Sequence, residues 1–258
     1  MNLTYSSVAA IVVVVVALAA FSTAALANEP GKTSPPAAQP APQNAPPEPQ
    51  DMKPLFNGKD LAGWSGHPKL WTVKDGVIHG ETTAQNKAPG NTFLIYTGGD
   101  DKNPQTFADF ELRLSFKLQG GNSGVQYRSK HLVGHKDNAW VVAGYQAEIA
   151  GLPGKDGFLY NEKGPKGRGY ASKSNYLAWV GDKVEIGPDG ISKVVGSLGE
   201  NGAIAAALKK TDWNDYVIIA KGNHLQHFIN GVQTIDCVDD DARNRASSGI
   251  IVFQIHVG

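Results

Sequence analysis

The clearest pattern in the sequence is a strict alternation of apolar and polar residues from Phe110 to Leu118. One set of alternate positions is apolar throughout, and the other consists of Glu, Arg, Ser and Lys. A period of two places these sets on opposite faces, so residues 110–118 are predicted to form a half-buried strand. Shorter apolar runs at 216–220 and 249–256 predict further strands.

Two dipeptides mark tight turns between apolar runs. Asp-Gly at 75–76 separates the two halves of 71–80, and Asn-Gly at 230–231 separates the two halves of 224–238. Both pairs suit the positive φ angles of a type I′ turn, which predicts two β-hairpins. One short helical turn is predicted at 204–210, and no strand–helix alternation is visible. The expected fold is therefore all-β, an antiparallel β-sandwich or jelly roll.

The first 27 residues carry no Asp, Glu, Lys or Arg and contain an unbroken apolar run, Val8 to Phe21. This run is followed by Ala25-Leu-Ala27, an arrangement that signal peptidase accepts. We predict a signal peptide at 1–27 and an extracytoplasmic protein, periplasmic or secreted. The alternative is an uncleaved N-terminal membrane anchor, the one case in which the membrane is a partner.

Residues 28–50 hold 8 of the 15 prolines without apolar periodicity, which predicts a disordered Pro/Ala-rich linker. From Asp51 the composition changes, and all five tryptophans follow. We therefore interpret 51–258 as one globular domain of 208 residues.

Charge and cysteine content exclude several classes of protein. The 24 basic and 24 acidic residues balance, which argues against a nucleic-acid partner, since such proteins need a basic face. The single cysteine, Cys237, excludes an internal disulfide and cysteine-based metal sites.

Three strand segments share a pattern in which two polar residues flank a third: Gln126-Tyr-Arg128, Gln146-Ala-Glu148 and Gln254-Ile-His256. Alternation sends both polar side chains of each triplet to one face and the intervening apolar residues to the core. Planar amides, a guanidinium, a carboxylate and an imidazole on one rigid face suit a polyhydroxylated ligand. The alternative is an ordinary solvated sheet face. Gly120–Gly124 precedes the first triplet and is either a tight turn or a loop that admits a ligand.

Other candidate motifs are weaker. Asp239–Asp241 could bind calcium, but we favour a solvated loop, because no EF-hand spacing follows. The pairs His131 with His135 and His224 with His227 do not match a helical metal motif. No nucleophile elbow, phosphate loop or paired-carboxylate glucanase motif is present.

Several stretches together resemble the domain of unknown function 1080 family, also called the 3-keto-disaccharide hydrolase domain. The matching stretches are 55–64, 71–78, 122–128, 144–149, 157–162, 213–214, 227–231 and 249–256. The resemblance implies a concanavalin A-like jelly roll and hydrolysis of glycosides that are oxidised at C3.

The resemblance also directs attention to particular residues, to which we assign roles by inference. The expected reaction is proton abstraction at C2, elimination at C1 and addition of water. Glu148 or His256 would be the base that removes the C2 proton, and Arg128 would stabilise the resulting enolate. The predicted substrate-binding residues are Asn122, Gln126, Gln146, Tyr160 and Gln254. A divalent cation chelated by the keto sugar and Glu148 or His256 is an open alternative.

Two hypotheses follow. The first is an exported hydrolase or lyase of 3-keto-glycosides, and the second is a non-catalytic carbohydrate-binding module on a flexible stalk. Members of the family continue with one more strand after the position of Gly258. We therefore expect a domain that lacks its last strand and has an unpaired edge or an unfilled slot in a sheet.

Overall fold

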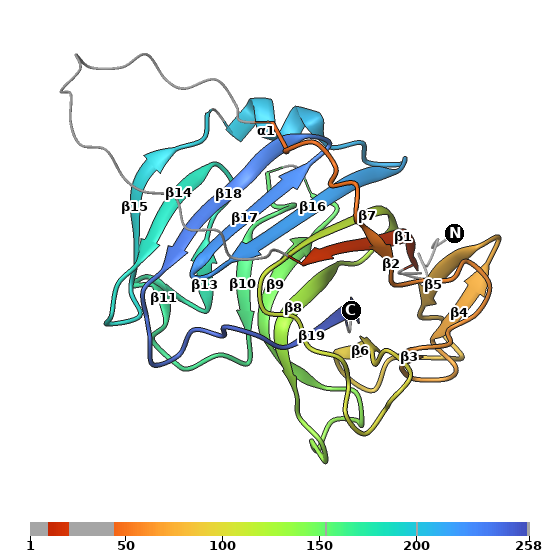
Figure 1. Cartoon of the computed structure of the whole chain (residues 1–258). Coiled ribbons are helices and arrows are strands. Elements are labelled where there is room, and N and C mark those ends of the chain that lie inside the picture. Colours follow the sequence, from red (N-terminus) through yellow and green to blue (C-terminus); the bar gives the residue numbers. More distant parts are fainter. Residues whose placement is uncertain (1–9, 21–43, 153, 200, 257–258) are drawn as a thin grey trace, which may run out of the picture.

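The computed structural model describes residues 10–20, 44–152, 154–199 and 201–256. Within these ranges two large β-sheets lie face to face, and a single short helix, α1 (Asn201–Ala207), lies at one end (Figure 1). The predicted all-β sandwich is confirmed. The predicted helical turn is also present, but it begins three residues earlier than expected.

The larger sheet forms one layer of the sandwich. In the described residues its order is β15 (Ser192–Ser197), β14 (Asp182–Ile186), β18 (Val232–Asp239), β17 (His224–Ile229), β16 (Asn214–Lys221), β7 (Phe110–Gln119), β1 (Ala10–Ala20), β5 (Val77–Glu81) and β4 (Trp71–Lys74), with β2 (Lys53–Pro54) paired to β1. Its pairs are antiparallel except for β14 with β18.

The smaller sheet carries most of the predicted site. Over the same described ranges its order is β13 (Tyr176–Ala178), β10 (Leu159–Glu162), β9 (Val142–Ile149), β8 (Ser123–His131), β19 (Ile250–Ile255), β6 (Thr92–Tyr96) and β3 (Trp64–Ser65). A separate two-stranded ribbon joins β11 (Gly169–Tyr170) and β12 (Lys173–Ser174).

Both predicted hairpins are confirmed. Asp75 and Gly76 have φ angles of 53° and 76°, and Asn230 and Gly231 have 49° and 84°. Positive φ at both central residues is what a type I′ turn requires. These turns join β4 to β5 and β17 to β18.

The core lies between the two sheets, where the alternation predicted it. The apolar positions of β7 are buried, whereas Arg113 and Lys117 on its other face are partly exposed. The smaller sheet contributes the residue inside each triplet and its apolar neighbours at alternate positions: Val125, Tyr127, Tyr145, Ala147, Ile149, Ile251, Phe253 and Ile255. The polar side chains of the triplets, with the exception of Arg128, therefore face outward, away from the larger sheet.

β1 lies inside the larger sheet, although its sequence also fits the apolar part of a signal peptide. It pairs antiparallel with β7, from Ala10 opposite Gln119 to Ala20 opposite Phe110, and with β5 on its other side. The valine-rich sequence of 10–20 has high β-propensity, which suits this position. β1 thus fills the position between β5 and β7. That the domain lacks a last strand stays a prediction. No helix in the described part of the chain is long and apolar enough to cross a membrane.

Candidate functional site

A connected row of amide side chains crosses the outer face of the smaller sheet. Gln126 on β8 lies opposite Gln146 on β9, and its Nε2 donates to Gln146 Oε1 at 2.8 Å. Gln146 Nε2 in turn donates to Gln254 Oε1 on β19 at 3.2 Å. All three side chains are buried. Gly124 makes the row possible, because a Cβ there would lie 2.7 Å from Gln146 Cγ.

Glu148 stands at the end of this row and is itself 5% exposed. Its Oε2 accepts a hydrogen bond from Gln146 Nε2 at 2.6 Å, and its Oε1 accepts one from Asn122 Nδ2 at 3.2 Å. Burial raises the pKa of Glu148 to about 7, and the nearby carboxylates of Asp156 and Glu162 add to the rise while the Gln146 hydrogen bond opposes it. Glu148 therefore exchanges a proton near neutral pH.

A cleft of about 550 Å³, part of it open to solvent, lies over these residues. It brings together six of the predicted site residues: Asn122, Gln146, Glu148, Tyr160, Gln254 and His256. Gln126 lies beside this set and reaches it through its hydrogen bond to Gln146. The side-chain Nε2 of Gln254 and Oδ1 of Asn122 are buried and have no hydrogen-bond partner among the described residues.

Arg128 is not part of this cluster, which corrects the prediction from alternation. A β-bulge interrupts the β8–β9 register between Tyr127 and Lys130, and Arg128 has a φ of 45°. Its guanidinium donates to the backbone oxygens of Ala108 and Gly222, each at 2.7 Å, and pairs with Asp109 at 3.1 Å. With its side chain 1% exposed, Arg128 joins loops and does not line the cleft.

Glu162 is the main residue that the sequence analysis missed. It lines the cleft two residues after Tyr160 on β10, opposite Gly144 of β9. It is 9% exposed, and burial raises its pKa. No side-chain hydrogen bond or ion pair of Glu162 occurs within the described part of the chain. Alternation along β10 from Tyr160 was the signal that could have identified it.

An aromatic wall closes one side of the cleft. Phe158 and Tyr176 line it and stack on each other at 5.3 Å between ring centroids, and Tyr176 stacks on Trp179 at 4.8 Å. The Lys173 ammonium lies 3.8 Å from the centroid of the Tyr176 ring. Aromatic faces beside amides are a common surface for sugar rings.

The residues of this cleft do not form a metal site by themselves. Across the described ranges, no group of three or more His, Cys, Asp or Glu side chains lies close enough to hold an ion.

The acidic run Asp239–Asp241 is not the solvated loop that we favoured. Asp239 and Asp241 are each 1% exposed, and both pair with the buried Arg168. Tyr145 also donates to Asp239. The run is therefore a structural ion-pair cluster that ties β18 to the segment before β11.

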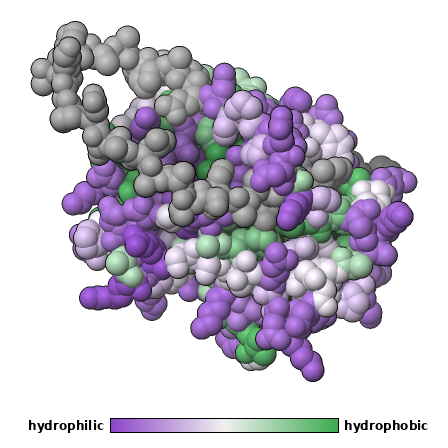
Figure 2. Space-filling model, in the orientation of Figure 1, coloured by the Kyte–Doolittle hydropathy of each residue, from purple (hydrophilic) through white to green (hydrophobic). Residues whose placement is uncertain are grey.

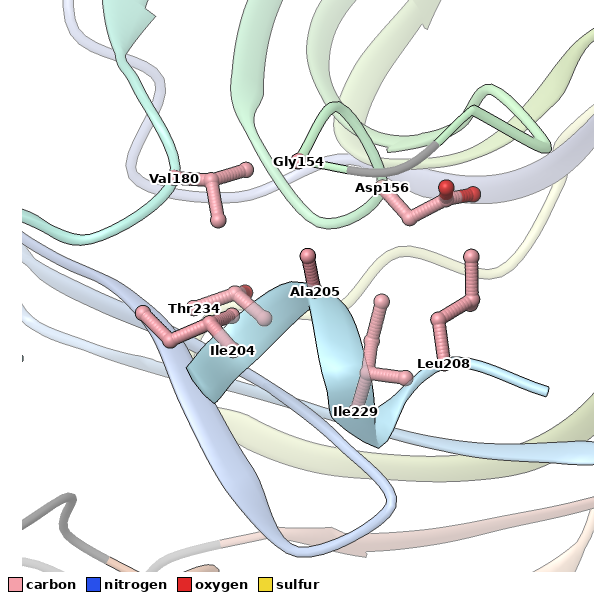
Figure 3. A pocket seen from close by; sticks show the side chains of 8 residues that line it. All are labelled: Gly154, Asp156, Val180, Ile204, Ala205, Leu208, Ile229 and Thr234. Carbon is pink, nitrogen blue, oxygen red and sulfur yellow. The ribbon is translucent and has the colours of Figure 1, made fainter. Parts of the chain in front are cut away.

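A second, smaller cavity lies between α1 and the larger sheet (Figure 3). Ala205, Ile229 and Leu208 line one side of it and Val180 lies on the other, and it has room for little more than a water molecule. Asp156 lies at its edge, and Asp156 Oδ1 accepts hydrogen bonds from the backbone N–H groups of residues 150 and 151, each at 2.9 Å. These hydrogen bonds hold the chain in place directly after β9.

The sequence model of the 3-keto-alpha-glucoside-1,2-lyase-like domain matches residues 51–258. The chain belongs to this family. The outer-face cleft thus lies within the lyase-like domain. The resemblance noted in the sequence is to the same family.

Solved structures similar to the lyase-like domain share low sequence identity with it. One is a protein from Parabacteroides distasonis ATCC 8503 provisionally named a glycosyl hydrolase, with 20% identity, a TM-score of 0.45, and coverage of 78% of this chain and 86% of that one. Another is the carbohydrate binding module CBM66 from Bacillus subtilis, with 12% identity, a TM-score of 0.43, and coverage of 76% and 89%. A comparison with curated proteins finds no match.

Proposed function

We propose that this protein is an exported carbohydrate-active enzyme that cleaves 3-keto-glycosides. The observation that carries the proposal is Glu148, a buried carboxylate with a pKa of about 7 at the wall of an open polar cleft. A base that is half ionised near neutral pH suits proton abstraction. Membership of the lyase-like family supports the same substrate class.

The proposed reaction begins at C2 of the sugar, where the C3 carbonyl acidifies the C–H bond. The Glu148 carboxylate accepts the C2 proton. The electron pair of the C2–H bond forms a C2–C3 double bond, and the negative charge of the enolate lies on O3. The enolate collapses to restore the C3 carbonyl, forms a C1–C2 double bond and expels the glycosidic oxygen from C1. That oxygen takes a proton and leaves as the aglycone alcohol. Water then adds across C1–C2, and the net reaction is hydrolysis.

The cleft offers groups for the remaining roles. Gln254 has an unpaired buried Nε2 that could donate a hydrogen bond to the enolate oxygen, the role first given to Arg128. Glu162 and His256 are the candidates to protonate the leaving oxygen, because both line the cleft with Glu148. Tyr176 and Phe158 would pack on the apolar face of the sugar.

The test is release of aglycone from a 3-keto-glucoside, run beside the unoxidised glucoside, with and without EDTA. We expect release from the keto compound alone, and a loss of release in EDTA would reveal a required cation. Glu148→Ala should abolish release, and Lys193→Ala, on the exposed face of β15, is the matched control. Full activity of both Glu148→Ala and His256→Ala would exclude the mechanism.

The second candidate function is carbohydrate binding without catalysis. The amide row and the aromatic wall favour it, because both can hold a sugar without any proton transfer. In that case titration calorimetry would detect binding of the glucosides while no aglycone is released.

Export is also a proposal, supported by the apolar run and the Ala-Leu-Ala sequence that follows it. The alternative is an uncleaved N-terminal anchor. Cleavage after Ala27 would remove β1 from the larger sheet. N-terminal sequencing of the protein from the culture medium or periplasm would distinguish the two.

A further inference from the structure

The cleft continues into a wider outer part of about 1190 Å³, which includes space open to solvent. Asn122, Glu148, Phe158, Tyr176 and His256 line both parts. The proposed base therefore lies between an inner part, lined with amides, and an outer part of different character. A glycoside whose C2 proton faces Glu148 would place its sugar in the inner part and its leaving group in the outer part.

The outer part has an apolar floor. Leu118 and Ala150 line it and are nearly buried, and Leu152 at its edge is 51% exposed. Leu152 is one of only four large apolar side chains exposed to this degree in the described part of the chain. Gly120 and Gly121, with φ angles of 81° and 69°, turn the chain here and contribute no side chains to obstruct the space.

The charges around the outer part are mainly positive. Lys155 and Lys210 line it, and both are exposed. Neither lysine forms an ion pair with any residue that the structure describes. Lys173 adds a third cation, above the Tyr176 ring that both parts share. Glu148 is the one acidic residue in the lining of the outer part.

We propose that the outer part binds a leaving group that is an apolar ring carrying a carboxylate. This inference rests on the proposed function and specifies its substrate. The ring packs on Leu118, Ala150 and Leu152, and the carboxylate lies between Lys155 and Lys210. A second sugar would need hydrogen-bond partners for several hydroxyl groups, and of the amide side chains in the cleft only Asn122 also lines the outer part.

The test compares two substrates that differ in one charge, 4-carboxyphenyl 3-keto-α-glucoside and its methyl ester. Each kcat/KM is divided by the rate of spontaneous elimination of the same compound, because the ester is the better leaving group. We expect the acid to be preferred about two- to thirtyfold at low salt, the range that two exposed ion pairs span. The preference should fall as salt is added, because exposed charges are screened.

Two variants locate the effect. Lys155→Ser/Lys210→Ser should lose the preference for the acid, while Lys102→Ser/Lys193→Ser, which removes the same charge from sites away from the cleft, should keep it. Leu152→Asn should raise the KM for both aryl substrates and leave the KM for methyl 3-keto-α-glucoside unchanged. Equal normalised rates for acid and ester, or a preference that survives the loss of both cleft lysines, would overturn the inference.

The outer subsite can also be tested if the protein turns out not to cleave 3-keto-glycosides. If no keto-glycoside is cleaved, binding of free 4-hydroxybenzoate and of its methyl ester to the full chain is measured by NMR titration. Tighter binding of the acid that Lys155→Ser/Lys210→Ser abolishes would still support the outer subsite. Equal binding of the two compounds would overturn it.

Discussion

At the scale of single residues, Glu148 combines two properties that conflict. It is buried, which destabilises its ionised form, and it accepts hydrogen bonds from Gln146 and Asn122, which position both oxygens. The result is a pKa of about 7, well above the ordinary value. A buried base with a raised pKa lowers the stability of the fold at neutral pH, and the same raised pKa makes it reactive there.

The pH dependence of activity follows from this pKa. As base, Glu148 must be ionised, so kcat/KM for a 3-keto-glucoside should rise with pH and level off above a midpoint near 7. Glu148→Gln should lower kcat by about 10²- to 10⁴-fold, the usual contribution of a general base. Aglycone release across pH 5 to 9 measures both. A flat profile in the wild type would contradict the assignment.

The Glu148→Gln variant, which loses activity, should gain folding stability relative to the wild type as the pH rises. The folded state holds the Glu148 proton up to pH 7, whereas the unfolded chain releases it near pH 4.5. Between these values the wild type therefore loses stability as pH rises. The unfolding free energy of Glu148→Gln minus that of the wild type should grow by up to about 3 kcal/mol over that window.

Urea titrations at pH 4.5 and pH 8 measure this difference. Buried His227, whose pKa burial lowers to about 4, acts with the opposite sign. Because His227 is present in both proteins, its effect cancels in the difference. A difference that does not change with pH would show that Glu148 ionises normally in the folded protein.

Arg128 should affect folding and not chemistry. Arg128→Lys removes the planar guanidinium group whose hydrogen bonds join Ala108, Gly222 and Asp109. The unfolding free energy should therefore fall by about 2 to 4 kcal/mol. The pH profile and kcat of the molecules that remain folded should stay within about twofold of the wild type. A folded variant with a hundredfold loss in kcat would instead return Arg128 to the catalytic set.

Side-chain alternation predicted which residues meet in the cleft wherever the strands are regular. It predicted that Gln126 and Gln146 share a face, and they lie opposite each other on β8 and β9. Gln254 on β19 joins them through its hydrogen bond to Gln146. It failed for Arg128, because a bulge depends on tertiary contacts that no local pattern reveals. Glu162 was missed because the significance of β10 depends on its pairing with β9.

At the scale of elements, the two hairpins were predictable from Asp-Gly and Asn-Gly, since turn chemistry is local. β1 was not, because a run of valines suits both a signal peptide and a strand that pairs on both sides. The acidic run at 239–241 was misjudged because its partner, Arg168, lies about 70 residues away in the sequence.

The role of β1 can be measured by deletion. Without residues 1–27, β5 and β7 lose the strand that lies between them and expose two unpaired edges. We expect the 28–258 protein to melt at a lower temperature than the full chain and to aggregate more readily. Circular dichroism and light scattering test this. Identical melting curves would mean that β1 contributes nothing to the folded domain.

At the scale of the whole molecule, the cleft and the core use opposite faces of the smaller sheet. The inward face packs against the larger sheet, and the outward face holds the amide row and Glu148. The face of the molecule seen in Figure 2, on the side of the larger sheet, is mainly hydrophilic where its residues are described. Composition and alternation predicted the sandwich, but the strand order and the loops that border the cleft required the structure.

The most direct test of the account is the rate of aglycone release from a 3-keto-glucoside with deuterium at C2, in competition with the protium compound. Abstraction of the C2 proton by Glu148 predicts slower release from the deuterated compound. It also predicts no release from the unoxidised glucoside, and release by Glu148→Gln that is slower by about 10²- to 10⁴-fold. Equal rates for the two isotopic compounds, together with release from the unoxidised glucoside, would contradict the elimination mechanism and the role of Glu148 in it.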